Sequence, residues 1–163
     1  MNDEKNAVFT DAKGDSWRIA ITFGDIMRVK NHVIGIDGKP LDLCYIAETG
    51  DFRQVTEHIE IVVKCVYWLL YNDIKEIADG DTANWFYARI DETVLPDLVK
   101  AWYEAIVNFT PSPVVKAAMI TAGQTKTEAQ ILAAIEILAG QLKTFTNTPE
   151  YSELTPKDTA TVN

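Results

Sequence analysis

The sequence has little positive charge, few cysteines and no long uninterrupted hydrophobic run. Its 163 residues include 15 Lys and Arg against 24 Asp and Glu, which gives a formal net charge of -9. Binding to nucleic acids or to anionic membranes is driven by clustered Lys and Arg, which this chain lacks. We therefore expect no nucleic-acid partner and no membrane partner, and a basic or polar protein partner fits the charge better.

Cys44 and Cys65 are the only cysteines, too few for a disulfide framework. We interpret both as reduced thiols of a cytosolic protein. Residues 1–9 contain no apolar segment of the kind that signal peptides have, and Lys64 and Asn72 interrupt the most apolar stretch. The sequence thus predicts neither a signal peptide nor a membrane span, and we expect a cytoplasmic location.

Apolar residues are abundant, at 47% of the chain, and they are most concentrated between Val55 and Tyr71. In a helix their i, i+3, i+4, i+7 spacing covers most of the surface. The narrow polar stripe that remains consists of Glu57, Glu60, Lys64, Tyr67 and Tyr71. Glu60 and Lys64 have the i, i+4 spacing of a helical ion pair. We predict a central helix that begins at Phe52 or Val55 and ends at about Ile77.

A β-hairpin is predicted over residues 7–21, where two strand-forming runs flank a turn cluster that contains Gly14. Residues 22–146 are predicted to be mainly helical. The fold class is therefore mainly α (α+β), with an N-terminal β-hairpin packed on a compact multi-helix domain around the central apolar helix. We expect residues 1–146 to form a single globular domain. Residues 147–163 have the composition of a disordered tail.

Cap residues and apolar spacing define the other predicted helices. A short amphipathic helix that begins at Thr22 or at Gly24-Asp25 is indicated by the spacing of Phe23, Ile26, Met27, Lys30 and Val33. Residues 41–46 are assigned to a helix rather than a strand. Further helices are predicted over 82–90, from Asp91 or Thr93 to Phe109, over 113–123 and over 127–145. The last has heptad spacing, so it either docks within the chain or forms a homo-oligomer with a second copy.

Sequence motifs for catalysis are missing. We find no Gly-rich phosphate loop, no His and Cys at metal-ligand spacing and no Gly-x-Ser-x-Gly. His32 and His58 are each isolated, and Asp79-Gly80-Asp81 is interpreted as a turn and helix cap rather than a metal site. We predict no enzymatic activity, no catalytic residue, no metal and no cofactor. An enzyme whose carboxylates are distant in sequence stays open as an alternative.

The aromatic residues are more suggestive because they are dense between positions 67 and 103. They are Tyr67, Trp68, Tyr71, Trp85, Phe86, Tyr87, Trp102 and Tyr103. One interpretation is an ordinary core with amphipathic rings at its edge. The other is an exposed aromatic patch for a protein partner, since Trp and Tyr are favoured interface anchors.

Residues 8–25, VFTDAKGDSWRIAITFGD, resemble the start of tail assembly chaperone-like proteins of phages and prophages. Those proteins begin with a strand, a Gly-containing turn, a Trp-containing strand and a helix with basic residues, here Ile26-Met-Arg-Val-Lys30. The apolar helix with Cys65, and Gly80-Asp81 before helices that end at Phe109-Thr-Pro111, are similar in order. The resemblance covers roughly residues 8–119. This chain departs from the pattern at Gly38-Lys39-Pro40 and at its aromatic segment 85–87.

The resemblance implies a non-enzymatic chaperone that keeps the tape measure protein soluble and helps tail tube protein assemble around it. Both proteins are then the expected partners. The partner-binding candidates are Tyr67, Tyr71, Trp85 and Phe86. A structural virion protein that self-assembles is the alternative from a different class.

Overall fold

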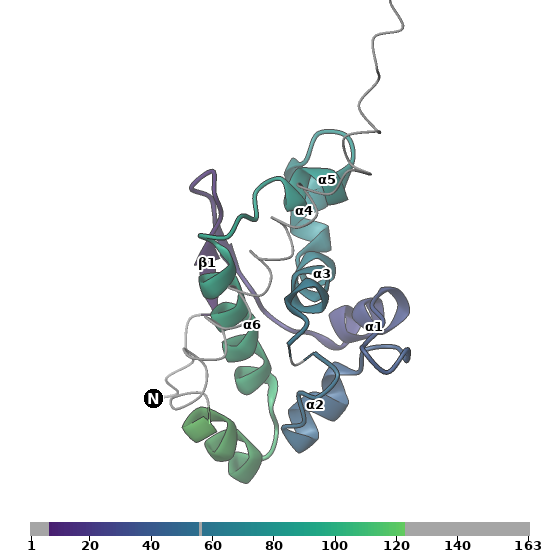
Figure 1. Ribbon diagram of the computed structural model, residues 1–163, viewed down its shortest axis with the longest axis vertical. Helices are drawn as coiled ribbons and strands as arrows, with labels where there is room; N and C mark the ends of the chain where they lie inside the picture. The colour runs from purple at the N-terminus through teal and green to yellow at the C-terminus, as the bar shows by residue number, and fades with distance from the viewer. Residues whose placement is uncertain (1–6, 56, 123–163) are drawn as a thin grey trace, which may run out of the picture.

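The structure is a computed structural model that describes residues 7–55 and 57–122 (Figure 1). It begins with strands β1 (Val8–Thr10) and β2 (Ser16–Arg18), which pair antiparallel with Phe9 opposite Trp17. Both of these side chains are buried, whereas their neighbours in the strands are exposed. The turn between the strands includes Gly14 at φ +92°, a conformation that favours glycine. The predicted hairpin is confirmed.

Helix α1 (Phe23–His32) begins at a capping box in which Thr22 accepts a hydrogen bond from the Asp25 N–H. Its buried face consists of Ile26 and Val29 and continues to Val33 after the helix. Phe23 and Met27, which contributed to the amphipathic pattern of this helix, are 75% and 57% exposed. Ile26, Val29 and Val33 form a separate i, i+3, i+7 stripe, and that narrower stripe packs towards the core.

Helix α2 (Leu43–Thr49) confirms the helical assignment of the 41–46 segment. Asp42 caps its first turn by accepting the Tyr45 N–H, and Gly50 ends it at φ +68°. Between α1 and α2 the chain forms a loop, closed by an isolated antiparallel bridge between Ile34 and Pro40. This loop forms one wall of a pocket.

The predicted central helix is present as two segments, α3 (Ile59–Leu69) and α4 (Tyr71–Ile77). It begins later than predicted because Glu57 has φ +68°, which is outside the helical region. Leu70 departs from helical geometry at φ -93° and ψ 5°, although its N–H still donates to the Val66 carbonyl. Figure 1 shows α3 between α1 and α6, and it packs against both. Its central position is confirmed.

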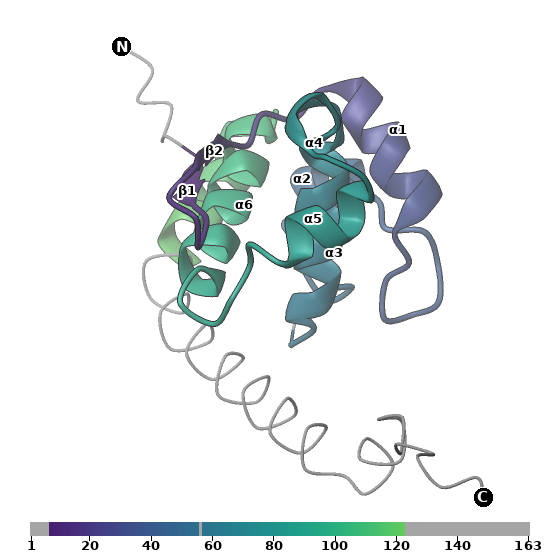
Figure 2. The ribbon, with the colours of Figure 1, turned by 90° about the horizontal axis from the view of Figure 1, so that it is seen from above.

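Helix α5 (Thr82–Tyr87) is capped by Asp81, as predicted, and α6 (Leu95–Phe109) has Pro96 in its first turn. Helix α6 ends before Pro111, and residues 113–122 are helical again. The hairpin lies along α6 (Figure 2), where β1 packs against the helix. The fold is therefore mainly α with a two-stranded antiparallel hairpin.

Three predictions lie outside the described residues: the 127–145 helix, the tail at 147–163 and the domain boundary at 146. Within 7–55 and 57–122, no helix has both the length and the apolar content needed to cross a membrane.

Candidate functional site

Trp85 lies at the junction between the hairpin and α5. Its ring meets the Trp17 ring edge to face with centroids 6.1 Å apart, and the Arg89 guanidinium lies 3.8 Å from its centroid. Arg89 also pairs with the carboxylates of Asp11 and Asp15 in the hairpin turn. Trp85 is partly buried in this cluster, so its described contacts are structural.

Tyr67 and Phe86 were predicted as surface contacts, and the structure corrects this. They are only 5% and 1% exposed. Helix α5 covers α3 at this point: the Tyr67 and Phe86 rings are 5.7 Å apart, and the Tyr67 hydroxyl lies 2.7 Å from the Thr82 hydroxyl. This hydrogen bond allows a tyrosine from the polar stripe to be buried without an unpaired hydroxyl.

Tyr71 keeps part of its ring at the surface, and two aromatic residues that were not among the candidates join it. Trp68 is partly exposed and Tyr87 is exposed. The rings of Tyr71 and Tyr87 lie 5.9 Å and 5.7 Å from the buried ring of Tyr67, so both border the same residue. We call Trp68, Tyr71 and Tyr87 the aromatic face.

Helix α1 supports one side of the aromatic face. The His32 ring stacks on Trp68 with centroids 3.8 Å apart, and the Arg28 guanidinium lies 5.9 Å from the Tyr71 centroid. Arg28 also donates to the Trp68 carbonyl oxygen. These contacts fix the positions of the Trp68 and Tyr71 rings. His32 thus has a packing role, in agreement with its interpretation as an isolated histidine.

A groove adjoins the aromatic face, with a volume of about 270 Å³. We call it the acidic groove; its lining residues are Ile59, Glu60, Val63, Lys64, Tyr87, Ile90, Asp91, Glu92 and Leu95. Tyr87 belongs to both the groove and the aromatic face. The groove lies between α3 and the segment that joins α5 to α6. No pattern in the sequence predicts that these two segments lie side by side.

The charged rim of the groove differs from the predicted arrangement. The Glu60 carboxylate lies 3.0 Å from Nδ1 of His58, and the predicted ion pair with Lys64 is not formed. Asp91 accepts the N–H groups of Thr93 and Val94 at the start of α6 and the Thr93 hydroxyl. The Thr93 hydroxyl is the main cause of the lowered pKa of Asp91. The rim thus combines three acidic side chains, Glu60, Asp91 and Glu92, with one basic side chain, Lys64.

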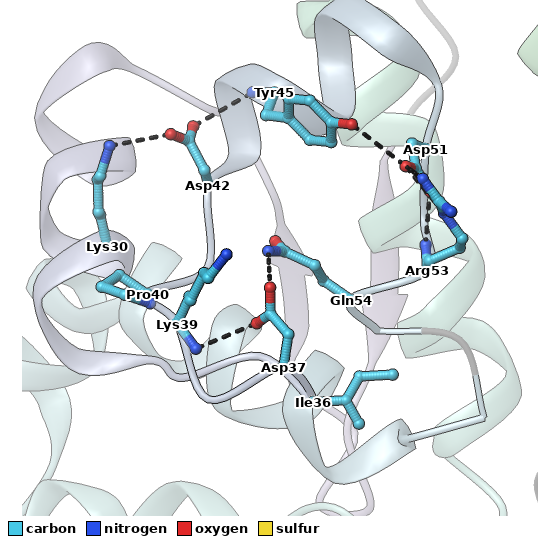
Figure 3. A pocket seen from close by; sticks show the side chains of 10 residues that line it. All are labelled: Lys30, Ile36, Asp37, Lys39, Pro40, Asp42, Tyr45, Asp51, Arg53 and Gln54. Atoms are coloured by element: carbon cyan, nitrogen blue, oxygen red, sulfur yellow. Dashed lines mark hydrogen bonds and ion pairs between the residues drawn. The ribbon is translucent and has the colours of Figure 1, made fainter.

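A second, larger pocket of about 810 Å³ lies between the loop before α2 and the segment after it (Figure 3). We call it the polar pocket; it is lined by Lys30, Ile36, Asp37, Lys39, Pro40, Asp42, Tyr45, Asp51, Arg53 and Gln54.

Each carboxylate of the polar pocket already has donors. Lys30 pairs with Asp42 at 2.9 Å and Arg53 with Asp51 at 2.6 Å, while Asp37 accepts the Lys39 N–H and the Gln54 amide. The side chain of Arg53 is the main cause that lowers the pKa of Asp51 to about 2. Hydrogen bonds also lower the pKa values of Asp37 and Asp42. Carboxylates with lowered pKa values are weak proton acceptors at neutral pH, so the pocket is better suited to binding than to proton transfer.

The remaining candidates from the sequence have structural roles. Gly80 has φ +79° and Asp81 caps α5, which confirms Asp79-Gly80-Asp81 as a turn and cap. Cys44 and Cys65 are free thiols, and burial raises the pKa of Cys65 to about 12. In the part of the chain that the structure describes, no three His, Cys, Asp or Glu side chains are grouped to hold a metal ion.

Comparison with known proteins gives no relative for this chain: no protein-family model matches it, and neither a curated protein nor a solved structure does.

Proposed function

We propose that this protein is a non-enzymatic chaperone of the phage tail assembly type that binds the tape measure protein and assists tail tube assembly. The observation that supports this is the aromatic face, Trp68, Tyr71 and Tyr87, beside the acidic groove, which α3 lines with apolar Ile59 and Val63. Partly exposed Trp and Tyr next to a groove form a suitable surface for an amphipathic client helix.

Two further properties fit a chaperone. Trp68 of the aromatic face and one wall of the groove belong to α3, which packs against both α1 and α6, so a client meets a rigid support and little ordering is needed on binding. The net charge of -9 opposes self-association and keeps a complex with an apolar client in solution.

Co-expression with a phage tape measure protein tests the proposal. We expect the wild type to bring the client into the soluble fraction, and Tyr71→Ala/Tyr87→Ala to lose most of that recovery. Tyr45→Ala is the matched control, because Tyr45 is also exposed but lines the polar pocket instead. The proposal is refuted if the wild type gives no soluble complex, and the aromatic face is excluded if the folded double variant performs as the control does.

The polar pocket favours a second candidate, a small-ligand binding protein. Lys39 carries an ammonium group that forms no ion pair within the described residues, beside the apolar surfaces of Ile36 and Pro40. An anionic ligand of small size suits this combination. A thermal-shift screen with small carboxylates and phosphates tests it: a stabilising compound whose effect is lost in Lys39→Ala supports ligand binding, and an unchanged Tm throughout argues against it.

The self-assembling virion protein stays as the structural alternative. Light scattering of the purified full chain distinguishes it, since a stable large oligomer would favour assembly and a monomer or dimer would favour the chaperone.

A further inference from the structure

We propose that the acidic groove binds a basic amphipathic segment, with an apolar side chain inserted between α3 and the α5–α6 connection and a Lys or Arg beside Glu60 and Glu92. This inference rests on the proposed function and deepens it by naming the chemistry of the client segment.

The shape of the groove favours a protein side chain over a small molecule. Its floor is apolar, formed by Ile59 and Val63 of α3 with Ile90 and Leu95 of the facing segment. Its volume of about 270 Å³ is below the roughly 300–1,000 Å³ of typical small-molecule pockets. A single large aliphatic or aromatic side chain, held by its own helix, fills such a space and removes both apolar surfaces from water.

The charge of the rim determines which segment fits. Glu60, Asp91 and Glu92 oppose Lys64, so the rim has an excess of two negative charges. Asp91 is already bound to the first turn of α6, and Glu60 contacts His58. Glu92 is exposed and forms no ion pair with any other described residue, so its charge is available to a partner. A basic segment is attracted electrostatically to this rim, whereas an acidic segment is repelled.

Tyr87 determines the direction in which the segment continues. Its ring borders the groove and also approaches the Tyr67 ring, which links it to the aromatic face. Burial raises the pKa of Tyr87, so its hydroxyl stays neutral and can donate a hydrogen bond. A helix with its anchor in the groove therefore has Tyr87, and then Tyr71, along its path.

Model peptides test the proposal without a known client. The probe is a fluorescein-labelled 18-residue peptide of leucine and lysine with an amphipathic helical pattern; the comparison peptide has glutamate in place of lysine. Fluorescence anisotropy with the full-length protein should show saturable binding of the lysine peptide and at least tenfold weaker binding of the glutamate peptide. Raising the salt concentration should weaken the first interaction.

Variants assign the binding to the groove. Glu60→Gln/Glu92→Gln should weaken the lysine peptide about tenfold, at roughly threefold for each exposed charge. Glu48→Gln/Glu76→Gln removes two exposed charges outside the groove and is the matched control, expected to change affinity less than twofold. Val63→Asp should reduce binding by more than tenfold, with folding checked by circular dichroism.

Equal affinity for the two peptides overturns the proposal. An equal loss of affinity for the lysine peptide in the groove variant and the control variant also overturns it, because it would indicate attraction by net charge alone. These outcomes are separate from co-expression. If the lysine peptide binds the groove but the tape measure protein is not recovered, the chaperone function fails and the groove stands. If the tape measure protein is recovered equally well by the groove variants, the groove assignment fails and the chaperone function stands.

Discussion

Replacing Asp11 by Ala should destabilise the fold far more than a change in a surface turn normally does. Asp11 is only 5% exposed, although it is a charged residue in a hairpin turn. One carboxylate oxygen accepts the N–H groups of Lys13 and Asp15 at 2.8 Å and 3.1 Å. The other accepts from the Trp17 indole at 3.0 Å and from Arg89 at 3.1 Å.

The expected loss follows from these four contacts. Removing one partner of a buried ion pair typically costs about 3–5 kcal/mol, because the remaining charge is left without its counterion. Arg89 keeps its ion pair with Asp15 and its side chain is 19% exposed, so water screens part of the loss. We therefore expect the free energy of unfolding to fall by about 3 kcal/mol, at the lower end of that range.

Urea unfolding followed by tryptophan fluorescence measures this change. Asp15→Ala is the control, because its side chain is 58% exposed and its pair with Arg89 should contribute less than about 1 kcal/mol. If the free energy of unfolding of Asp11→Ala lies within about 1 kcal/mol of the wild-type value, the contacts of Asp11 do not stabilise the hairpin.

The same residue predicts a pH dependence. Burial alone would raise the pKa of Asp11, but the hydrogen bonds from Trp17, the turn backbone and Arg89 outweigh it and hold the pKa below its ordinary value of 3.8. Its stabilising contribution is then complete above that value and is lost as the pH falls through the lower pKa of the folded protein. The stability difference between wild type and Asp11→Asn should narrow between neutral pH and about pH 3, and a gap that widens would contradict the assignment.

Three further changes test local features of the fold. Gly50→Ala should reduce the free energy of unfolding by about 1 kcal/mol, because Gly50 has φ +68°, which is unfavourable for alanine. Steric clash adds nothing, since the new Cβ would lie at ordinary contact distances of 3.6 Å from Met119 and Val115. An unchanged free energy in urea unfolding would contradict this. Thr22→Ala should cost about 1 kcal/mol by removing the α1 cap, whereas Thr22→Ser should cost little, and equal losses would argue against capping. Cys44 should react first with a thiol reagent under native conditions, and Cys65, with its pKa raised to about 12, only on unfolding; early labelling of Cys65 would show that the core opens.

Features with local signals were predictable from the sequence. Gly14 supplied the left-handed turn, Thr22 and Asp81 supplied caps, and Pro96 marked the first turn of α6. Each acts within three or four residues of its position, so the hairpin and several helix ends followed from the residues alone. The start of α3 was missed because Val55 is apolar and buried although it lies in a turn before the helix.

The candidate surface depended on contacts between distant segments and was predicted only in part. Helical spacing placed Tyr67 and Tyr71 on one polar stripe, but α5 covers the first and leaves the second partly exposed. Thr82 supplies the hydroxyl that Tyr67 needs, 15 residues further along the chain. Trp68 and Tyr87 replace Tyr67 and Phe86 at the surface because of this arrangement, which no periodicity in the sequence expresses.

The contact between Asp11 and Arg89 spans 78 residues, and this separation affects how the chain is made. The hairpin also packs on α6, so its apolar side has no cover until Leu95–Phe109 has been synthesised. At a synthesis rate of about 5–20 residues per second, on the order of 5–20 s pass between the synthesis of the hairpin and that of the end of α6. During that interval α1, α2 and α3 can already assemble with one another. The hairpin is therefore synthesised before these helices but reaches its native place after them.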